Sequence, residues 1–338
     1  MANKNNIEKR KSDHILLAHQ SQMIDDMLDS RFYYEPMMSS HPLKNADIAI
    51  DFLGFNLKTP IWVSSMTGGT EIAKTINTNL AKACGEYGMG MGLGSCRALL
   101  ESKDRFADFD VKKYMSDQPL YANLGIAQIE KLLSAGKLES ISEMIKQLQA
   151  DGLIIHVNPL QEWLQPEGDR FSAAPIITIS KIIDALPSLK IIVKEVGQGI
   201  GPKSLKALYN LPIEAVDFAA GGGTNFASLE LMRSTDKLKE SNVSLSKVGH
   251  SAIEMVTMAN DIFNKEDIIC KQTIISGGIK NYLDGYHLTS ILNGKAIYGQ
   301  AYAFLKEAMG SYSDLQQHVE QQIKGLQMAN SFLVPKGI

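Results

Sequence analysis

Cysteine is scarce in this chain, and long apolar runs are absent. The 338 residues include three cysteines, Cys84, Cys96 and Cys270, with no C-x-x-C pair and no His at zinc-ligand spacing, which excludes a disulfide scaffold and a zinc site of the common kind. No run approaches the roughly 20 apolar residues of a membrane-spanning helix. The polar start, Met1–Arg10, lacks the apolar core of a secretory signal. The sequence therefore predicts a reduced, cytoplasmic protein with no membrane partner.

An excess of charge of one sign is lacking as well. The formal net charge is −3 and the pI is near 6.2, so we expect no nucleic-acid or anionic-membrane partner. With 44% hydrophobic and 21% charged residues and a mean hydropathy of −0.09, the composition is that of a globular protein, which excludes disorder and a collagen-like structure. Any phosphate group that binds must be held by a local arrangement of residues.

What the sequence does contain is an alternation of strands and helices. Length alone would suggest two domains, but α/β barrels do not follow that rule. Residues 1–58 are polar and irregular, whereas from Pro60 short Val- and Ile-rich runs alternate with amphipathic segments, as in parallel sheets. No G-x-G-x-x-G follows the first run, which disfavours a doubly wound sheet. We expect an α/β fold, a (β/α)8 TIM barrel over residues 59–338 with residues 1–58 as an N-terminal extension, and strands in Ile61–Ser65, Met89–Leu93, Leu120–Asn123, Leu153–His156, Ile191–Lys194, Ala215–Phe218, Thr273–Ser276 and Ala296–Tyr298.

Apolar residues spaced at three and four predict the helices. One is expected in the extension, and one inside the longest connection, from about Gly221 to Lys271. A last helix is expected to close the chain. The expected helices are Leu16–Leu28, Ile72–Tyr87, Ile141–Gln149, Ile176–Leu186, Ala252–Phe263, Tyr282–Leu292 and Tyr302–Met328.

Glycines crowd the predicted ends of the last strands. Gly221–Gly223 and Gly277-Gly278 follow two apolar runs, and the loops after the last strands of such a barrel commonly hold a phosphate on backbone N–H groups. A single one of these glycines could equally serve a tight turn. Taken together they predict a phosphorylated ligand.

Polar residues at the ends of two middle strands are the other candidates. Lys194 ends an apolar strand, where it could be a Schiff-base amine, a cation beside an electron-rich ring, or a partner of Glu195. His156, Asn158, Gln161 and Glu162 form the densest polar cluster. In that cluster His156 could be purely structural, and Glu162 could hold Mg²⁺ or be a solvated carboxylate.

The leader carries a basic pair, Arg10-Lys11, which could be a solvated pair of charges or an arm that folds over the barrel mouth to contact a polyanionic substrate. Its apolar residues could form an interface between copies or pack on their own barrel. These residues are Phe32, Tyr33, Tyr34, Met37 and Met38.

Together these motifs resemble those of type 2 isopentenyl-diphosphate isomerase, a flavin-dependent family. The similarity runs in order over most of the chain, and its most specific stretch is His156 to Glu162 followed by Pro166-Glu167-Gly168. The other matching residues are Arg10-Lys11-Ser12-Asp13-His14, Met66-Thr67-Gly68-Gly69, Gly94-Ser95-Cys96-Arg97, Asn123, Lys194-Glu195-Val196-Gly197, Gly222-Gly223-Thr224 and Ser276-Gly277-Gly278.

The resemblance implies conversion of isopentenyl diphosphate to dimethylallyl diphosphate with Mg²⁺ and reduced FMN, with NADPH as the reductant and flavin N5 as the acid/base group. It also implies a homo-oligomer, a tetramer or octamer. Glu162 would ligate Mg²⁺, and the catalytic residues would be Gln161, Lys194, Glu230 and His156. FMN would be bound by Met66, Thr67, Gly68, Ser95, Asn123, Lys194, Thr224, Gly277, Gly278, Gln300 and Ala301, and the substrate by Arg10, Lys11, Ser95, Cys96, Arg97, His156, Asn158 and Gln161.

This sequence departs from the family pattern in several places. Cys96 stands where an amide residue is expected, Lys280 replaces an arginine, and Ala219-Ala220 precedes the glycine triplet where a more glycine-like pattern is usual. The alternative function is that of another FMN-dependent barrel, a 2-hydroxy-acid oxidase or dehydrogenase. Such an enzyme needs a His base and Arg residues near the seventh strand, where Lys271–Ile275 has no His and Lys280 is the nearby cation. That difference favours the isomerase.

Overall fold

A closed barrel of parallel strands forms the centre of the molecule. The computed structural model describes residues 2–43, 46–65, 68–235 and 240–337. The barrel runs in the order β10-β11-β4-β5-β6-β7-β8-β9, which confirms the predicted TIM barrel. Every predicted strand overlaps an observed one. The strands are β4 Ile61–Val63, β5 Gly90–Gly92, β6 Leu120–Gly125, β7 Gly152–His156, β8 Ile191–Lys194, β9 Ala215–Asp217, β10 Gln272–Ser276 and β11 Lys295–Gln300.

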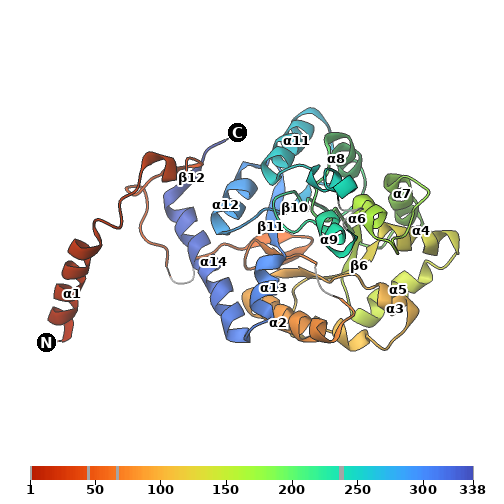
Figure 1. Ribbon diagram of the computed structural model, residues 1–338, viewed down its shortest axis with the longest axis horizontal. Coiled ribbons are helices and arrows are strands. Elements are labelled where there is room, and N and C mark those ends of the chain that lie inside the picture. Colours follow the sequence, from red (N-terminus) through yellow and green to blue (C-terminus); the bar gives the residue numbers. More distant parts are fainter. Residues whose placement is uncertain (1, 44–45, 66–67, 236–239, 338) are drawn as a thin grey trace.

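Helices surround the barrel, and the two termini lie outside it (Figure 1). Five of the seven predicted helices overlap helices at or near the predicted bounds. The first helix of the chain, α1, spans Ala2–Leu17. The helices after α1 are α2 Glu71–Tyr87, α3 Arg97–Glu101, α4 Ile126–Ser134, α5 Glu139–Leu148, α6 Pro159–Leu164, α7 Pro175–Ala185, α8 Pro202–Tyr209, α9 Phe226–Arg233, α11 Ala252–Lys265, α12 Tyr282–Ile291, α13 Tyr302–Ala308 and α14 Tyr312–Phe332.

The predicted single helix Tyr302–Met328 is wrong, because the chain forms α13 and α14 with a break at residues 309–311. Ser311 starts a new helix there. Its side chain accepts from the Asp314 N–H while the Asp314 carboxylate accepts from the Ser311 N–H, which is a capping box. Apolar periodicity persists across the break, so the hydrophobic pattern alone does not reveal it.

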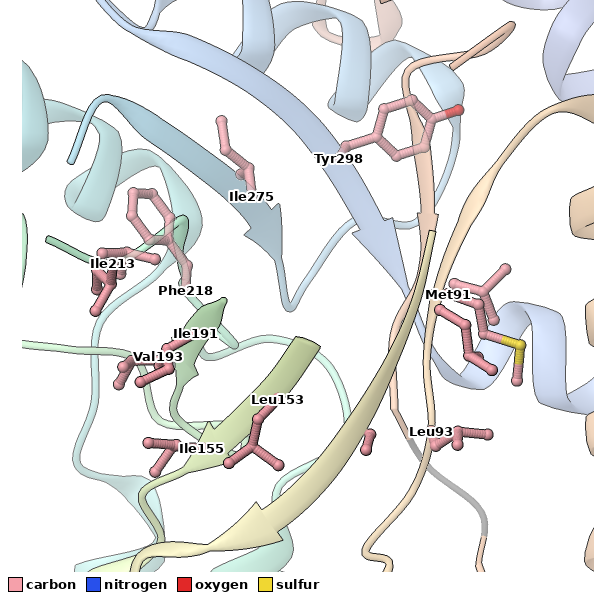
Figure 2. Packing of buried hydrophobic residues seen from close by; sticks show 14 of the residues in the cluster. Met91, Leu93, Leu153, Ile155, Ile191, Val193, Ile213, Phe218, Ile275 and Tyr298 are labelled. Atoms are coloured by element: carbon pink, nitrogen blue, oxygen red, sulfur yellow. The ribbon is translucent and has the colours of Figure 1, made fainter. Parts of the chain in front are cut away.

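The main hydrophobic core lies between the barrel and the helices. Figure 2 shows part of this cluster, with Leu153 and Ile155 of β7 beside Ile191 and Val193 of β8. These strands read as continuous apolar runs because both of their faces are covered. The fold therefore buries residues on the outside of each strand against helices and leaves the inside for a second, separate cluster.

A hairpin closes the amino-terminal end of the barrel. It consists of β2, Ile50–Phe52, and β3, Phe55–Leu57. Its two-residue loop has positive φ at both Leu53 (55°) and Gly54 (81°), the geometry of a type I′ turn. The Leu53 side chain is fully buried and its N–H donates to Gln272 Oε1 at 2.8 Å. The extension thus supplies part of the barrel core.

The rest of the extension differs from the prediction. The expected helix Leu16–Leu28 is wrong: α1 spans Ala2–Leu17 and is followed only by a short 3-10 turn, Asp25–Met27. The apolar residues after Leu17 on which that prediction rested are exposed. Without a surface to pack against, an amphipathic pattern does not stabilise a helix. In Figure 1, α1 stands apart from the barrel.

A second part of the extension returns to the barrel wall. Strand β1, Phe32–Tyr34, pairs antiparallel with β12, Leu333–Pro335, so the prediction of an irregular extension missed its short strands. Phe32 is buried and contacts the rings of Tyr286 and His287. The other four apolar leader residues, Tyr33, Tyr34, Met37 and Met38, are exposed in the single chain.

Within the described ranges, no helix combines the length and the apolarity needed to cross a membrane. The three cysteines are free thiols buried in the protein.

Candidate active site

Six of the eight barrel strands change from apolar to polar within two residues along their inner side. One apolar cluster fills the amino end of the barrel together with the hairpin, and it includes Trp62, Tyr121, Ile154, Ile192, Ala215 and Ile274. Side chains two residues apart on a strand share a face. The next inward positions, toward the carboxyl end, are therefore Ser64, Asn123, His156, Lys194, Asp217 and Ser276.

His156 and Asn123 form a hydrogen-bonded pair in this polar layer. Asn123 donates from Nδ2 to Leu93 O at 3.0 Å, which leaves its Oδ1 facing His156 Nδ1 at 2.7 Å. Nδ1 therefore carries the proton and donates to Oδ1, while Nε2 is an acceptor. Burial, aided by the positive charge of Lys194, lowers the pKa of His156 to about 3. The imidazole is neutral near pH 7.

Lys194 lies between His156 and Asp217 on neighbouring strands, in direct register with both. It is 7% exposed, and its Nζ donates to Glu195 O at 2.6 Å. Asp217 is fully buried and accepts a hydrogen bond from Ser276 Oγ, while its Oδ2 has no partner within the described part of the chain. Burial raises the pKa of Asp217, and the charge of Lys194 opposes that shift. Lys194, the cation predicted from the sequence, therefore lies in a layer of low dielectric constant and lines the cavity above it.

A cavity of about 560 Å³ opens above this layer, beside the last four strands. Its wall contains Lys194, Thr224, Gly277 and Gly278, together with the turn at Gln300-Ala301. The structure thus brings these six predicted flavin-binding residues to one place, although they come from four different strand ends.

Gly277 has no room for a side chain. Its φ is +85°, and an added Cβ would lie 2.1 Å from Ala220 O. The close approach of two strand ends, which only glycine permits here, turns the loop after β10 into the cavity. The glycine pair is therefore required by backbone packing, and it exposes backbone to the cavity as well.

Buried polar atoms without partners line the same cavity. Ser64 Oγ, Ser65 Oγ and Gln300 Oε1 have no hydrogen-bond partner among the described residues. Such atoms cost free energy unless a ligand or water satisfies them. They indicate that the cavity is built to take a polar ligand.

A second group of polar residues follows β7 on α6. Asn158, buried at the start of α6, donates from Nδ2 to Gln161 Oε1 at 3.0 Å and to Glu162 Oε1 at 3.1 Å. Gln161 in turn donates to Glu230 Oε1 at 3.3 Å, and Glu230 Oε2 accepts from Arg233 at 2.6 Å. Gln161 and Glu230, both predicted to be catalytic, thus contact each other, since α6 and α9 lie side by side.

Glu162 is the candidate metal ligand. Its carboxylate is 8% exposed and accepts from Asn158 and, through Oε2, from the Asp169 N–H at 2.6 Å. Among the described residues no three His, Cys, Asp or Glu side chains converge on a metal position. The nearby Asn158 Oδ1 is buried and has no hydrogen-bond partner in the ranges that the structure describes. One carboxylate and one amide oxygen suit Mg²⁺, which completes its shell with phosphate and water.

The segment after β5 supplies less than the sequence predicted. Cys96 is fully buried; its Sγ lies 3.4 Å from Gly94 O and its N–H donates to Asn123 O. Burial raises the pKa of its thiol to about 12. Because both its thiol and its N–H are engaged in the interior, the substrate contact predicted for Cys96 has no support in this arrangement.

The neighbours of Cys96 are accessible. Ser95 and Arg97 are exposed, and Arg97 Nη1 pairs with Asp169 Oδ2 at 3.1 Å. Gly68 contacts this segment, because an added Cβ would lie 2.7 Å from Ser95 O. Met66 and Thr67, also predicted to bind FMN, lie outside the described residues.

The basic pair of the leader lies away from these residues. Arg10 and Lys11 are exposed on α1, which stands apart from the barrel in Figure 1. The structure of the single chain therefore does not bring them to the cavity.

Asp217 and Ser276 are the site residues that sequence reasoning left without a role. Asp217 had the same signal that identified Lys194, a charged residue within an apolar strand. Ser64 and Ser65 were recognised only as part of a strand. Their period-two spacing from the buried Trp62 and Val63 fixes which one faces the axis.

No family model matches the chain. It is 33% identical over 325 residues to a protein of Rickettsia felis, covering 95% of this chain and 91% of the relative. It is 32% identical over 331 residues to a protein of Synechocystis, covering 95% and 90%. Both relatives are named isopentenyl-diphosphate delta-isomerase.

Solved structures of similar fold are flavin enzymes. A mandelate oxidase variant with an FMN adduct has a TM-score of 0.55 at 12% identity, covering 90% of this chain and 88% of the other. A flavocytochrome b2 variant with pyruvate has a TM-score of 0.61 at 13% identity, covering 88% and 71%. These similarities establish the barrel fold alone. With the identity to its curated relatives extending over nearly its whole length, the chain belongs to the type 2 isopentenyl-diphosphate delta-isomerase family of enzymes.

Proposed function

We propose that this protein interconverts isopentenyl diphosphate and dimethylallyl diphosphate, with reduced FMN in the 560 Å³ cavity and Mg²⁺ at Glu162. The observation that carries the proposal is the convergence of Lys194, Gly277-Gly278 and Gln300 on one cavity, in a chain whose curated relatives carry that activity in their names. NADPH is proposed as the reductant. A homo-oligomer and a cytoplasmic location stay predictions.

The cavity residues fit a flavin. The unpartnered Ser64 and Ser65 hydroxyls and the Gln300 carbonyl suit the polar edges of the ligand, and the Gly277-Gly278 loop suits its phosphate. When bound and reduced, the flavin supplies an acid/base group at N5, while the protein supplies position and electrostatics. The residues proposed to hold it are Met66, Thr67, Gly68, Ser95, Asn123, Lys194, Thr224, Gly277, Gly278, Gln300 and Ala301.

Lys194 is the proposed electrostatic partner of the cofactor. Its ammonium group is nearly buried, so a negative charge on a bound ring system would be stabilised far more than in water. The present contact, to Glu195 O, is a neutral acceptor that Lys194 can exchange for a charged one.

Gln161 and Glu230 are the proposed proton-handling residues of the protein. Gln161 holds Glu230 Oε1, and Arg233 holds Oε2, so the Glu230 carboxylate is fixed at the edge of the substrate region. In this arrangement Gln161 orients the substrate alkene. Glu230 would take up the proton removed from one substrate carbon, and the proton added at the other would come from the acid/base group of the bound flavin, so that no net proton or electron is gained. Asn158 keeps the Gln161 amide in one orientation, since it donates to Gln161 Oε1.

The substrate diphosphate is proposed to lie between His156 and the exposed Arg97, with Arg10 and Lys11 of the leader completing the site. Cys96 is not needed for it. His156 is neutral in the free protein and presents Nε2 as an acceptor. The charge of a bound diphosphate would raise its pKa and turn Nε2 into a donor.

The decisive experiment is to purify the protein, record the flavin absorption, and assay isomerisation of isopentenyl diphosphate aerobically and after dithionite reduction. We expect a bound flavin, activity only after reduction, and dependence on added Mg²⁺. Activity that persists after FMN removal would overturn the proposal.

A Glu162→Gln variant tests the metal site separately. Loss of the carboxylate charge should raise the Mg²⁺ concentration needed for half-maximal activity by about tenfold, because Mg²⁺ prefers carboxylate oxygens. Glu167→Gln, on the exposed loop that follows α6, is the matched control. An unchanged Mg²⁺ titration for Glu162→Gln would make it a structural carboxylate.

The fold likeness to mandelate oxidase and flavocytochrome b2 supports one other candidate, oxidation of a 2-hydroxy acid. The segment Lys271–Ile275 carries no His base, and Lys280 is the cation on the cavity wall there. Oxygen uptake or flavin bleaching with mandelate or lactate measures this activity directly. We expect neither.

A further inference from the structure

A second cavity, of about 580 Å³, lies in the helical layer rather than over the barrel axis. Its side walls are α7 and α8, and its other lining includes Leu160 at the start of α6 and residues 248–250 of the connection before α11. It is as large as the first cavity, and none of the residues predicted from sequence for FMN or substrate lines it except Lys194.

The deep end of this cavity is apolar. Ile179 of α7, Val193 of β8 and Leu208 of α8 form it. All three are nearly fully buried, so the walls belong to the packed core. Nearer the opening, Leu160, Ile176 and Ile200 continue the apolar surface. A space of this size with apolar walls favours a hydrocarbon chain as its occupant.

The mouth of the cavity favours an anion. Both α7 and α8 begin there. The Pro at the first position of each helix donates no N–H, so the partial positive charge of each helix start comes from the N–H groups that follow it. Lys203 and Ser204 of the first turn of α8 line the mouth. His250 lies over the same turn, since a Cβ on Gly201 would be 3.4 Å from its Nε2.

One carboxylate, that of Glu195, also lines the cavity, but it is not free to repel an anion. Its Oε2 accepts from the N–H groups of Gly197 at 2.7 Å, Gln198 at 2.6 Å and Gly199 at 3.2 Å. Burial raises the pKa of Glu195 and so favours its neutral form, and the three N–H groups offset the charge of its ionised form. The positive character of the two helix starts and Lys203 therefore dominates the mouth.

We infer that this cavity is a second binding site, for an anionic amphiphile whose linear apolar chain lies between α7 and α8 and whose phosphate or carboxylate head lies at the two helix N-termini. Two sources have this chemistry: a prenyl diphosphate longer than the five-carbon substrate, and a fatty acid. Because Lys194 lines both cavities, an occupant here also touches the wall of the first. The binding itself does not depend on the proposed isomerase activity.

The test uses the intact protein and measures binding by calorimetry. Farnesyl diphosphate and dodecanoate are the two amphiphiles. Farnesol and inorganic diphosphate are the half-ligands. We expect an amphiphile to bind at least about tenfold more tightly than either half-ligand, as when two sets of contacts act together. If neither amphiphile binds more tightly than the half-ligands, the inference is wrong. If only one amphiphile binds, its head group identifies the anion that the site prefers.

Two variants separate this site from the first cavity. Ala207→Phe fills the space between α7 and α8, and should weaken the amphiphile by about tenfold or more. Ile177→Phe, at an exposed position of α7 that does not line the cavity, is the matched control and should bind normally. Both variants are expected to keep the flavin and isomerase activity, which also shows that they fold.

A third variant, Lys203→Glu, reverses one charge at the mouth, and Lys181→Glu, exposed on α7, is its control. Only Lys203→Glu should weaken binding. If Ala207→Phe and Lys203→Glu both bind normally, the ligand lies elsewhere and the second site is excluded. If isopentenyl diphosphate displaces the amphiphile competitively, the ligand occupies the proposed substrate site, and the second site is again excluded. If the wild-type protein binds the amphiphile but shows no isomerase activity, only the proposed function is refuted.

Discussion

The two ends of the barrel interior are built by the same strands and do opposite things. At the amino end, Trp62, Ile154 and Ile192 pack against the hairpin in a fully apolar cluster. Two residues further along, the strands present Ser64, His156 and Lys194. The first layer gains stability from burial, and the second holds polar groups that burial disfavours. Residues that stabilise the barrel and residues proposed for the chemistry therefore lie only two positions apart on the same strands.

The largest expected effect falls on the amino end. Phe52→Ala removes a fully buried ring from the hairpin that closes the barrel. It should lower the free energy of unfolding by about 3 to 5 kcal/mol, from lost burial and the cavity left behind. Urea denaturation measures the change. Phe55→Ala is the control, because this ring on the same hairpin is only partly buried and should cost less. An equal loss of stability in both variants would contradict the view that the apolar layer at the amino end stabilises the barrel.

Lys194→Met tests the carboxyl end of the same interior. Removing a preorganised charge beside a reacting group typically costs about a hundredfold to a thousandfold in rate, so isomerase activity should fall by that factor. Stability should stay level or rise, since a desolvated ammonium group is replaced by an apolar chain. Activity and urea denaturation are both measured.

Lys190→Met is the matched control for Lys194→Met. Lys190 lies just before β8, at the opposite end of the barrel, with its Nζ 5.5 Å from the centre of the Phe55 ring. Its replacement should leave the rate unchanged. A large stability loss with Lys194→Met, or a rate loss with Lys190→Met, would break the separation of the two ends.

Most of this separation could be predicted from the sequence, and the exceptions have physical causes. Lys194 and His156 ended apolar runs, so their place followed from strand periodicity. Asp217 also ends an apolar run, but no role was predicted for it. The hairpin at Leu53-Gly54 was missed because Leu is not a usual residue for positive φ. Arg10 and Lys11 depend on a leader whose contacts are not set by local pattern, so their role stays a prediction.

Gln161→Ala extends the comparison to α6, which carries the chemistry outside the barrel axis. We expect turnover to fall by about a hundredfold, while the flavin absorption is unchanged because Gln161 does not line the 560 Å³ cavity. The Glu230 carboxylate would lose its contact to Oε1. Gln165→Ala, just after the end of α6, serves as control. If the Gln161→Ala variant turns over normally, Gln161 has no part in proton handling.

The smallest effect concerns His156, which links the polar layer to stability through pH. Its pKa is about 3 in the folded protein and about 6.5 when unfolded, so between these values the unfolded chain binds more protons. The stabilisation is complete above the unfolded pKa and declines as the pH falls toward 3. Urea denaturation gives the free energies of unfolding of the wild type and of His156→Gln. The difference between them should fall by about 1 kcal/mol between neutral pH and about pH 5. We expect less than the full shift implies because the ring is only partly shielded from solvent. If this difference does not change with pH, His156 has an ordinary pKa, and the carboxyl end of the barrel is more hydrated than the burial of its neighbouring residues indicates.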